Sequence, residues 1–306
     1  MNLQQLRIIR ETVRRQFNLT EAAASLNTSQ SGVSKHIKDL EDELGIELFV
    51  RKGKRLLGVT EPGREIAEIT ERILVDIGNI KRLGAQYAAQ DEGRLTIATT
   101  HTQARYTLTE VVRKFRQAYP KVHLTLHQGS PNEIAEMVAR GDAEIAIATE
   151  TLANTTQLAT FHYYEWTHGI IVPKEHPLAS AQQLTLAAIA EYPIITYHDG
   201  FTGRRHIDSA FSEAGLAPDI VMSAMDTDVL KTYVGLGLGV GIIASMAFDP
   251  ATDRELRFLP ASGLFPLNTT WIAIRRGSVL RGFAYRFIEL CSSHLDEKTV
   301  RGVAQS

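Results

Sequence analysis

The sequence contains a single cysteine and no long apolar run. Cys291 is that cysteine, so no intrachain disulfide can form, and its place in an apolar helical pattern is typical of a buried small side chain. No stretch reaches the length that a membrane-spanning helix needs, and the N-terminal sequence MNLQQLRIIRETVRRQF lacks the core and cleavage site of a signal peptide. We therefore expect a cytoplasmic protein that makes no contact with a membrane.

Motifs of catalysis, nucleotide binding and metal binding are also missing. The sequence has no Gly-x-Ser-x-Gly elbow and no P-loop. The glycine-rich stretch 235–241 ends a predicted helix and leads into a strand, the reverse of the order in a dinucleotide-binding fingerprint. His162, His168 and His176 have neither metal-ligand spacing nor cysteine companions. We expect no enzyme activity, no metal site and no cofactor.

The formal net charge of −2 hides an asymmetry along the chain. Residues 1–59 hold ten Lys/Arg and seven Asp/Glu, an excess of +3 that leaves −5 for the remainder. A weakly basic head on an acidic body indicates that only the head touches nucleic acid.

Two short helical patterns meet at a polar turn between Asn18 and Glu43. Thr20 is the expected cap of the first helix, and Thr28 or Ser29 that of the second. Small alanines on the first helix allow the second to cross it closely, as in a helix-turn-helix. Apolar residues recur at spacings of three and four on both sides of the turn: Leu19, Ala22, Ala23 and Leu26, then Val33, Ile37, Leu40 and Leu44.

The outer face of the second helix carries short hydroxyls, an amide and cations, which suit base edges and phosphates in a major groove. These candidate DNA-binding residues are Ser29, Gln30, Ser31, Ser34, Lys35 and Lys38. Two predicted strands, 46–50 and 56–60, follow around a basic tip that includes Arg51 and Lys54. The pattern predicts a wing on the DNA backbone or in the minor groove. The alternative is a small helical scaffold with a merely solvated polar face.

One long helix is predicted from Glu61 to about Ala88, with Pro62 in its first turn. A narrow isoleucine stripe is typical of a coiled-coil seam, and it comprises Ile66, Ile69, Ile73, Ile77 and Ile80. We expect this helix to pair with a second copy and so to present two heads to two half-sites on DNA. The alternative is a helix that lies on its own domain. We assign residues 1–60 to the DNA-binding domain and residues 61–89 to this linker.

Residues 90–306 alternate predicted strands with helices, which favours parallel sheets with crossover helices. The order of these elements predicts two lobes, one of about 90–163 with 268–306 and one of about 164–267. The fold class is therefore α/β, with an N-terminal winged helix-turn-helix, a long linker helix and a two-lobed effector domain like a periplasmic binding protein. A cleft between the lobes is the expected ligand site.

Hydroxyl-rich segments follow predicted strands at 99–106, 129–131 and 149–151, and another opens a helix at 200–204. Hydroxyls and free backbone N–H groups at helix starts favour an anion. Such a pocket can hold a small oxyanion or a carboxylate without a buried cation. Tyr164 and Trp166, near the crossing between the lobes, are candidate walls. The alternative is that each segment is an ordinary helix cap or core element.

Several motifs carry a resemblance to a known family. The head contains Ala-Ala-x-x-Leu-x-x-Ser-Gln-Ser-x-Val-Ser, and the body contains TTHTQARY, HQGSP, AIATE, GFTGR and KTYVGLGLGVGIIASMA. The chain resembles LysR-type transcriptional regulators, in particular the CysB and Cbl branch that controls sulfur assimilation and cysteine biosynthesis. An exported solute receptor would share the cleft, but the helix-turn-helix argues against one. No visible catalytic site supports an enzyme.

The resemblance implies a homotetramer that contacts double-stranded promoter DNA, with O- or N-acetylserine as inducer and sulfate or a related anion as pocket ligand. Carried over by motif, the effector-binding residues are Thr100, Thr102, Gln103, Ser130, Thr149, Trp166 and Thr202. The implied function is regulation of sulfur-assimilation and cysteine-biosynthesis genes. The alternative is a Cbl-like regulator of sulfonate use that responds to adenosine phosphosulfate. The wing exit at 58–62 departs from the usual pattern and leaves the choice of branch open.

Overall fold

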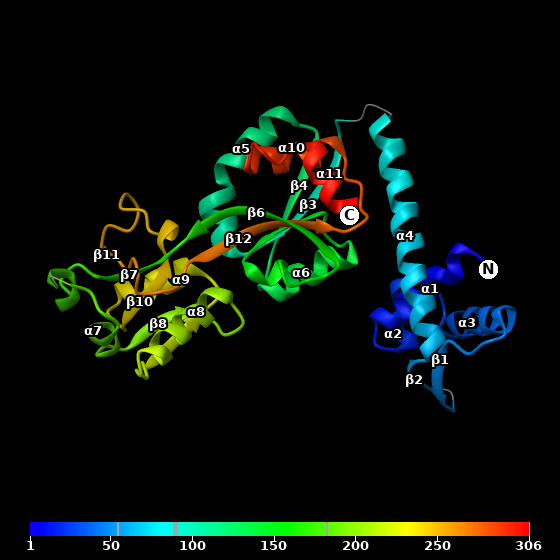
Figure 1. Cartoon of the computed structure of the whole chain (residues 1–306), viewed down its shortest axis with the longest axis horizontal. Helices are drawn as coiled ribbons and strands as arrows, with labels where there is room; N and C mark the ends of the chain where they lie inside the picture. Colours follow the sequence, from blue (N-terminus) through cyan, green and yellow to red (C-terminus); the bar gives the residue numbers. More distant parts are fainter. Residues whose placement is uncertain (54, 88–90, 182, 306) are drawn as a thin grey trace. The chain divides into compact units, whose positions relative to one another are not determined.

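The computed structural model describes residues 1–53, 55–87, 91–181 and 183–305 (Figure 1). The chain divides into two compact units, residues 1–84 with 277–279, and residues 85–276 with 280–306. Within the described ranges, no helix combines the length and the apolar character needed to cross a bilayer.

The first unit holds a helix-turn-helix followed by a two-stranded wing. Asn18, not Thr20, caps the second helix, because its side chain accepts the N–H groups of Thr20 and Glu21. Ser29 caps the third helix, and Asn27 forms the tight turn with φ 51°, a conformation that asparagine tolerates. The elements are α1 (Leu3–Arg14), α2 (Leu19–Ser25), α3 (Gln30–Leu44), β1 (Phe49–Lys52) and β2 (Arg55–Val59).

Glu41 fastens the wing to α3. Its buried carboxylate accepts the backbone N–H groups of Leu48 and Phe49 at 2.8 and 3.2 Å and pairs with Arg51 at 2.6 Å. A buried carboxylate is tolerated where several donors surround it. The first wing strand begins at Phe49, later than the predicted start at 46, because the N–H groups of Ile46 and Leu48 bind the backbone carbonyl and the carboxylate of Glu41 instead of a neighbouring strand.

A single helix, α4 (Glu61–Tyr87), follows the wing as predicted. Thr60 caps its start by accepting the N–H of Gly63 at 3.0 Å. Thr70 and Leu74 are buried within the unit, whereas Ile69 and Ile80 are 45% and 69% exposed. Two members of the isoleucine stripe are therefore left uncovered by this chain.

The second unit contains two five-stranded sheets. We call the sheet β4-β3-β5-β12-β6 and its helices the first lobe, with α5, α10 and α11 on one face and α6 on the other (Figure 1). Ile97 and Ala98 of one strand belong to cores on opposite faces, as expected for a sheet covered on both sides. The elements are β3 (Gly93–Thr99), η1 (Gln103–Thr107), α5 (Leu108–Ala118), β4 (Val122–Gln128), α6 (Pro131–Arg140), β5 (Ile145–Ala148), η2 (Glu150–Leu152), β6 (Leu158–Trp166), β12 (Asn268–Arg275), α10 (Gly282–Cys291) and α11 (Glu297–Gln305).

The second lobe is built in the same way around the sheet β11-β7-β10-β8-β9. Ile170 packs into the core beneath α7 and α8, whereas Ile171 packs toward α9. The elements are β7 (His168–Pro173), η3 (Pro177–Ser180), α7 (Leu186–Ala190), β8 (Ile194–Tyr197), α8 (Thr202–Glu213), β9 (Ile220–Ala224), α9 (Thr227–Gly235), β10 (Val240–Ala244), η4 (Ser245–Ala247) and β11 (Leu256–Pro260).

The expected α/β class with a two-lobed body is confirmed, but the sheets are mixed rather than parallel. β12 runs antiparallel to β5 and β6, and β7 runs antiparallel to β10 and β11. β6 and β11 are edge strands whose burial is partial, so their apolar pattern along the sequence is weak. The chain crosses from β6 to β7 at Thr167, a little beyond the expected boundary near 163.

Polar contacts join the lobes where α9 begins beside the π-helical turn η1. Asp226 lies 3.2 Å from the His101 imidazole, and the Thr227 and Thr102 hydroxyls are 3.2 Å apart. Asp228 accepts the Tyr106 hydroxyl at 2.5 Å and pairs with Arg105 at 2.5 Å.

Lys231 extends these inter-lobe contacts one turn along α9. It is buried, lies 3.3 Å from Asp228 and 3.0 Å from Asp253, and its ammonium stands 5.0 Å from the centre of the Tyr106 ring. Burial alone would raise the pKa of the Asp228 carboxyl, but hydrogen bonds from Tyr106 and Lys231 and the charge of Arg105 lower it.

Gly63 provides a test of the packing between the wing and α4. A Cβ there would lie 2.0 Å from the Leu48 carbonyl oxygen, so we expect Gly63→Ala to reduce the free energy of unfolding by about 1–3 kcal/mol. Gly84→Ala on the same helix is the matched control, because a Cβ there meets no described atom within 4 Å. We expect it to be neutral or stabilising by up to about 1 kcal/mol. Equal urea midpoints for both variants would contradict this packing.

Asp228→Asn provides a test of the inter-lobe contacts. At pH 7 we expect the free energy of unfolding to fall by about 1 kcal/mol, because the carboxylate is partly exposed and its ion pairs are screened. Because the Asp228 carboxyl has a lower pKa in the folded state, its contacts stabilise the fold at pH values above the ordinary pKa of 3.8. This stabilisation is lost as the pH falls through the lower pKa of the folded state. The gap in melting temperature between wild type and variant should therefore be constant from pH 7 to 5 and shrink below pH 4. A gap independent of pH would refute the assignment.

Candidate functional site

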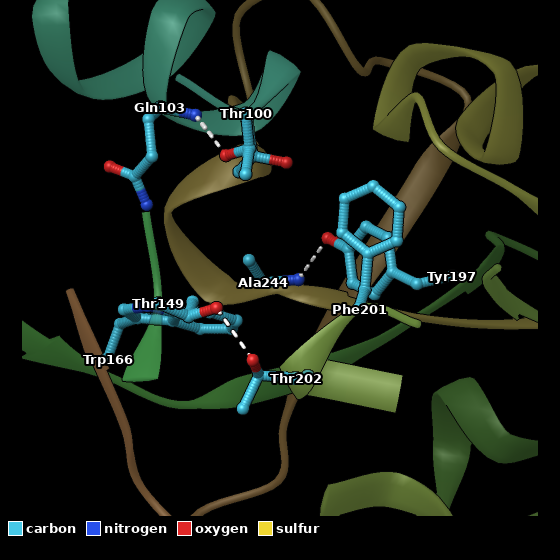
Figure 2. Close-up of a pocket in the computed structure, with 10 residues that line it drawn as sticks. Thr100, Gln103, Thr149, Trp166, Tyr197, Phe201, Thr202 and Ala244 are labelled. Carbon is cyan, nitrogen blue, oxygen red and sulfur yellow. Dashed lines mark hydrogen bonds between the residues drawn. The ribbon is translucent and has the colours of Figure 1, made fainter. Parts of the chain in front are cut away.

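A pocket opens between the two lobes, where strand ends and helix starts meet (Figure 2). Its empty volume is about 380 Å³ with the open mouth included, which suits a small molecule. The lining residues are Thr100, Thr102, Gln103, Thr149, Trp166, Tyr197, Phe201, Thr202, Gly203 and Ala244.

The structure brings together six of the seven residues that the motifs suggested. Thr100, Thr102, Gln103, Thr149, Trp166 and Thr202 all line the pocket. Ser130 does not line it. Its hydroxyl contacts the Glu133 carboxylate at 2.8 Å and forms, with the backbone, a reciprocal cap at the start of α6. Ser130 is therefore an ordinary helix cap, as the alternative interpretation had it. The ligand-binding role of the other six residues stays a prediction.

Hydroxyl groups bridge the lobes across the pocket. The Thr149 hydroxyl of the first lobe donates to the Thr202 hydroxyl of the second at 2.8 Å (Figure 2). Thr151 stands 3.4 Å from the same Thr202 oxygen. Thr202, at the first position of α8, thus faces the opposite lobe directly, and a ligand placed between the lobes would meet its hydroxyl.

Gln103 and Trp166 are held by a shared partner, Thr270. The Gln103 amide donates to the Thr270 hydroxyl at 3.3 Å, and the Trp166 indole N–H donates to it at 3.1 Å. Tyr164 donates its hydroxyl to the Gln103 amide oxygen at 2.5 Å. Tyr164, considered as a pocket wall, instead orients Gln103, and Trp166 lines the pocket with its N–H already engaged.

Four lining residues were not singled out from the sequence: Tyr197, Phe201, Gly203 and Ala244. The Tyr197 hydroxyl accepts the Ala244 N–H at 2.8 Å (Figure 2) and lies 3.1 Å from the Thr227 hydroxyl. Burial raises the pKa of Tyr197, so its phenol stays neutral. Phe201 and Gly203 lie in the GFTGR motif, which offered a signal, whereas the pairing of Tyr197 with Ala244 depends on neighbouring strands.

No lining residue carries a formal charge at neutral pH. The start of α8 supplies electropositive character instead, because the first N–H groups of a helix have no acceptor within it. In the part of the chain that the structure describes, Phe201 provides no side-chain cap for these groups. Hydroxyls, an amide and free backbone N–H groups can bind the oxygens of a small anion without a buried cation.

One further group has the spacing of metal ligands among the described residues: His101, Asp226 and Asp228, whose ligand atoms lie within 4.8 Å of one another. Arg105 and Lys231 already contact the Asp228 carboxylate. Their positive charges oppose a divalent cation, so these residues act as inter-lobe contacts and we assign them no metal.

The candidate DNA-contacting residues form a polar face on α3. Gln30, Ser31, Lys35 and Lys38 are exposed, and Ser34 is half-buried. The Ser29 hydroxyl accepts the Gly32 N–H at 3.1 Å as the helix cap. Arg51 is engaged with Glu41, which positions it within the wing. Lys54 lies outside the described residues.

Comparison with known proteins identifies both parts of the chain. Residues 3–64 match the bacterial regulatory helix-turn-helix protein family, lysR type, and residues 88–296 match the LysR substrate binding domain. The chain is 54% identical over 303 residues to the HTH-type transcriptional regulator SsuR of Burkholderia cenocepacia, covering 99% of this chain and 98% of SsuR. It is 51% identical over 310 residues to CysB of the same organism, covering 100% and 99%.

A solved structure agrees with these matches. The cofactor-binding domain of the Cbl transcriptional regulator superposes with a TM-score of 0.67 at 47% identity, covering 70% of this chain and 95% of that domain. Both family matches, the full-length relatives and the two-lobed fold agree. The chain belongs to the LysR family of DNA-binding transcriptional regulators.

Proposed function

We propose that this regulator controls genes of sulfur assimilation and cysteine biosynthesis, and that a small oxyanion or carboxylate bound between the lobes is its effector. The observation that carries the proposal is the convergence of six motif residues on one uncharged pocket at the start of α8. Sulfate and acetylserine both present oxygens that hydroxyl and backbone N–H donors can bind. The similarity to SsuR and CysB supports sulfur metabolism as the context.

The effector acts by exchanging contacts between the lobes. The Thr149–Thr202 hydrogen bond joins the first lobe to the second. A ligand oxygen that accepts the Thr149 hydroxyl proton replaces this bond with one to the ligand, and so favours a different relation of the lobes. An effector shifts an equilibrium only through such differential contacts.

DNA binding falls to the exposed face of α3 and to the wing. Lys35 and Lys38 supply charge for phosphates, while Gln30 and Ser31 supply donors and acceptors for base edges. The uncovered Ile69 and Ile80 of α4 support a coiled-coil contact with a second copy, as in a dimer or tetramer. Two heads would then bind two half-sites of a promoter in the cytoplasm.

A second candidate is a Cbl-like regulator of sulfonate use that responds to adenosine phosphosulfate. The chain is 51% identical to CysB of Burkholderia cenocepacia and 51% identical to cbl of Escherichia coli, so identity favours neither. The two candidates differ in the effector, which makes a titration the decisive experiment.

The experiment is fluorescence anisotropy of the full chain on a cysteine-operon promoter fragment at fixed salt. N-acetylserine, sulfate and adenosine phosphosulfate are added separately. A shift in DNA affinity with N-acetylserine or sulfate supports the first candidate. A response to adenosine phosphosulfate alone supports the second, and no response to any of the three removes both.

Thr202→Val tests the pocket. The substitution keeps the side-chain shape but removes the hydroxyl that faces the opposite lobe, so we expect sulfate and N-acetylserine affinity to fall about tenfold by isothermal titration calorimetry. Thr196→Val is the control, because the Thr196 hydroxyl is buried against the Ile242 carbonyl and does not line the pocket. DNA affinity without effector should be unchanged in Thr196→Val. Wild-type effector affinity in Thr202→Val would place the ligand elsewhere.

Lys35→Ala tests the DNA-contacting face. Loss of one phosphate contact should weaken binding to every DNA sequence and make the slope of log affinity against log salt shallower by about one. Lys114→Ala, at an exposed position in α5, is the control for removal of one positive charge. Effector affinity should not change in either variant. An unchanged salt slope in Lys35→Ala would exclude this residue from the contact set.

A further inference from the structure

His168 lies next to the pocket, and one of its ring nitrogens has no hydrogen-bond partner among the described residues. It begins β7 and is 1% exposed. Burial lowers the pKa of its imidazole to about 3, with a smaller contribution from His206, so the ring is neutral. Its Nε2 is buried, and no atom of the described chain offers it a hydrogen bond. A buried polar atom without a partner is unusual in a native fold and requires an explanation.

Asn268 determines which nitrogen of His168 carries the proton. The Asn268 amide oxygen lies 3.0 Å from Nδ1 of His206, and its amide nitrogen lies 3.4 Å from Nδ1 of His168. An amide nitrogen only donates, so Nδ1 of His168 accepts. The proton of the neutral ring is therefore on Nε2, and the unpartnered atom is a hydrogen-bond donor.

Gly203 is the pocket-lining residue that lies against that donor. Gly203 lines the pocket in the first turn of α8. A Cβ at this position would lie 3.1 Å from Nε2 of His168 and 3.4 Å from the Trp166 ring. Because glycine has no side chain, no Cβ stands at this position between His168 Nε2 and the two lining residues Gly203 and Trp166. The orphaned N–H and the uncapped start of α8 thus meet at one place.

We propose that His168 is a ligand-binding residue of this pocket, whose Nε2–H donates to an oxygen of the bound oxyanion or carboxylate, directly or through one water. The proposal rests on the proposed function, because it assumes that the pocket binds such a ligand. A neutral donor suits this site, where every lining residue is also uncharged. Ligand binding gives the buried donor the acceptor that the chain does not supply, so the bond strengthens binding more than an exposed one would.

The alternative is that His168 acts only by packing. Its ring meets the Trp166 and Phe265 rings edge to face, with centroids 5.1 and 5.5 Å apart. The two roles separate by substitution. His168→Phe keeps an aromatic ring against these neighbours and removes the donor, whereas His168→Gln removes the ring and keeps an amide N–H near the position of Nε2.

The experiment is isothermal titration calorimetry of the full chain with sodium sulfate and, separately, with N-acetylserine. We expect the dissociation constant to rise at least tenfold in His168→Phe and less than threefold in His168→Gln. His176→Phe is the control, a histidine of the same lobe that caps η3 and packs against Tyr192 instead of Gly203 and Trp166. Unchanged affinity in His168→Phe overturns the proposal. Equal losses in both His168 variants, at unchanged melting temperature, overturn it in favour of packing.

A measurement on the wild type keeps the test independent of whether His168→Phe folds. In protein labelled with ¹⁵N-histidine, the His168 Nε2–H resonance is identified by its absence from His168→Gln. We expect it to shift as sulfate saturates the pocket, and a resonance unmoved at saturation contradicts the proposal. If the wild type binds neither probe, the proposed function itself fails. Binding by the wild type with no effect at His168 removes this inference alone.

Discussion

The pocket depends on backbone N–H groups that a helix cannot satisfy by itself. α8 begins at Thr202 directly between the two lobes, and its first N–H groups lack a side-chain cap among the described residues. Hydroxyls and an indole from both lobes gather around this point and hydrogen-bond with one another. The same groups that hold the lobes together would therefore meet a bound anion, and under the proposed function this couples ligand binding to the lobe arrangement.

An equivalent constraint organises the DNA-binding head. The buried Glu41 carboxylate needs several donors, and it takes them from the start of the wing and from Arg51. The wing is thereby fastened to α3, the helix that carries the candidate DNA contacts. Exposed lysines on that helix remain available for phosphates, whereas Arg51 has a structural partner. One buried charge thus holds the wing, through Arg51 and the strand start, on the helix whose exposed face carries the candidate DNA contacts.

Much of the candidate site could be predicted, because its residues lie in local motifs. Five lining residues follow strands or begin helices, and the predicted order of elements indicated these places: Thr100, Thr102, Gln103, Thr149 and Thr202. Ser130 fits the same rule, but the carboxylate three residues later engages it in a cap. Ala244 could not be found, since it reaches the pocket through strand pairing and a bond to a distant tyrosine.

The sequence by itself determined the helix-turn-helix, the long α4 and the alternation of buried strands with helices, because these depend on apolar spacing within short segments. Only the tertiary structure decided the antiparallel edge strands, whose half-buried faces carry a weak pattern. It also decided that Arg51 pairs with Glu41 and that the Nε2 of His168 lies unpaired beside Gly203. Hydrogen-bond partners far apart in the chain meet only after the sheets have formed, and no local spacing records them.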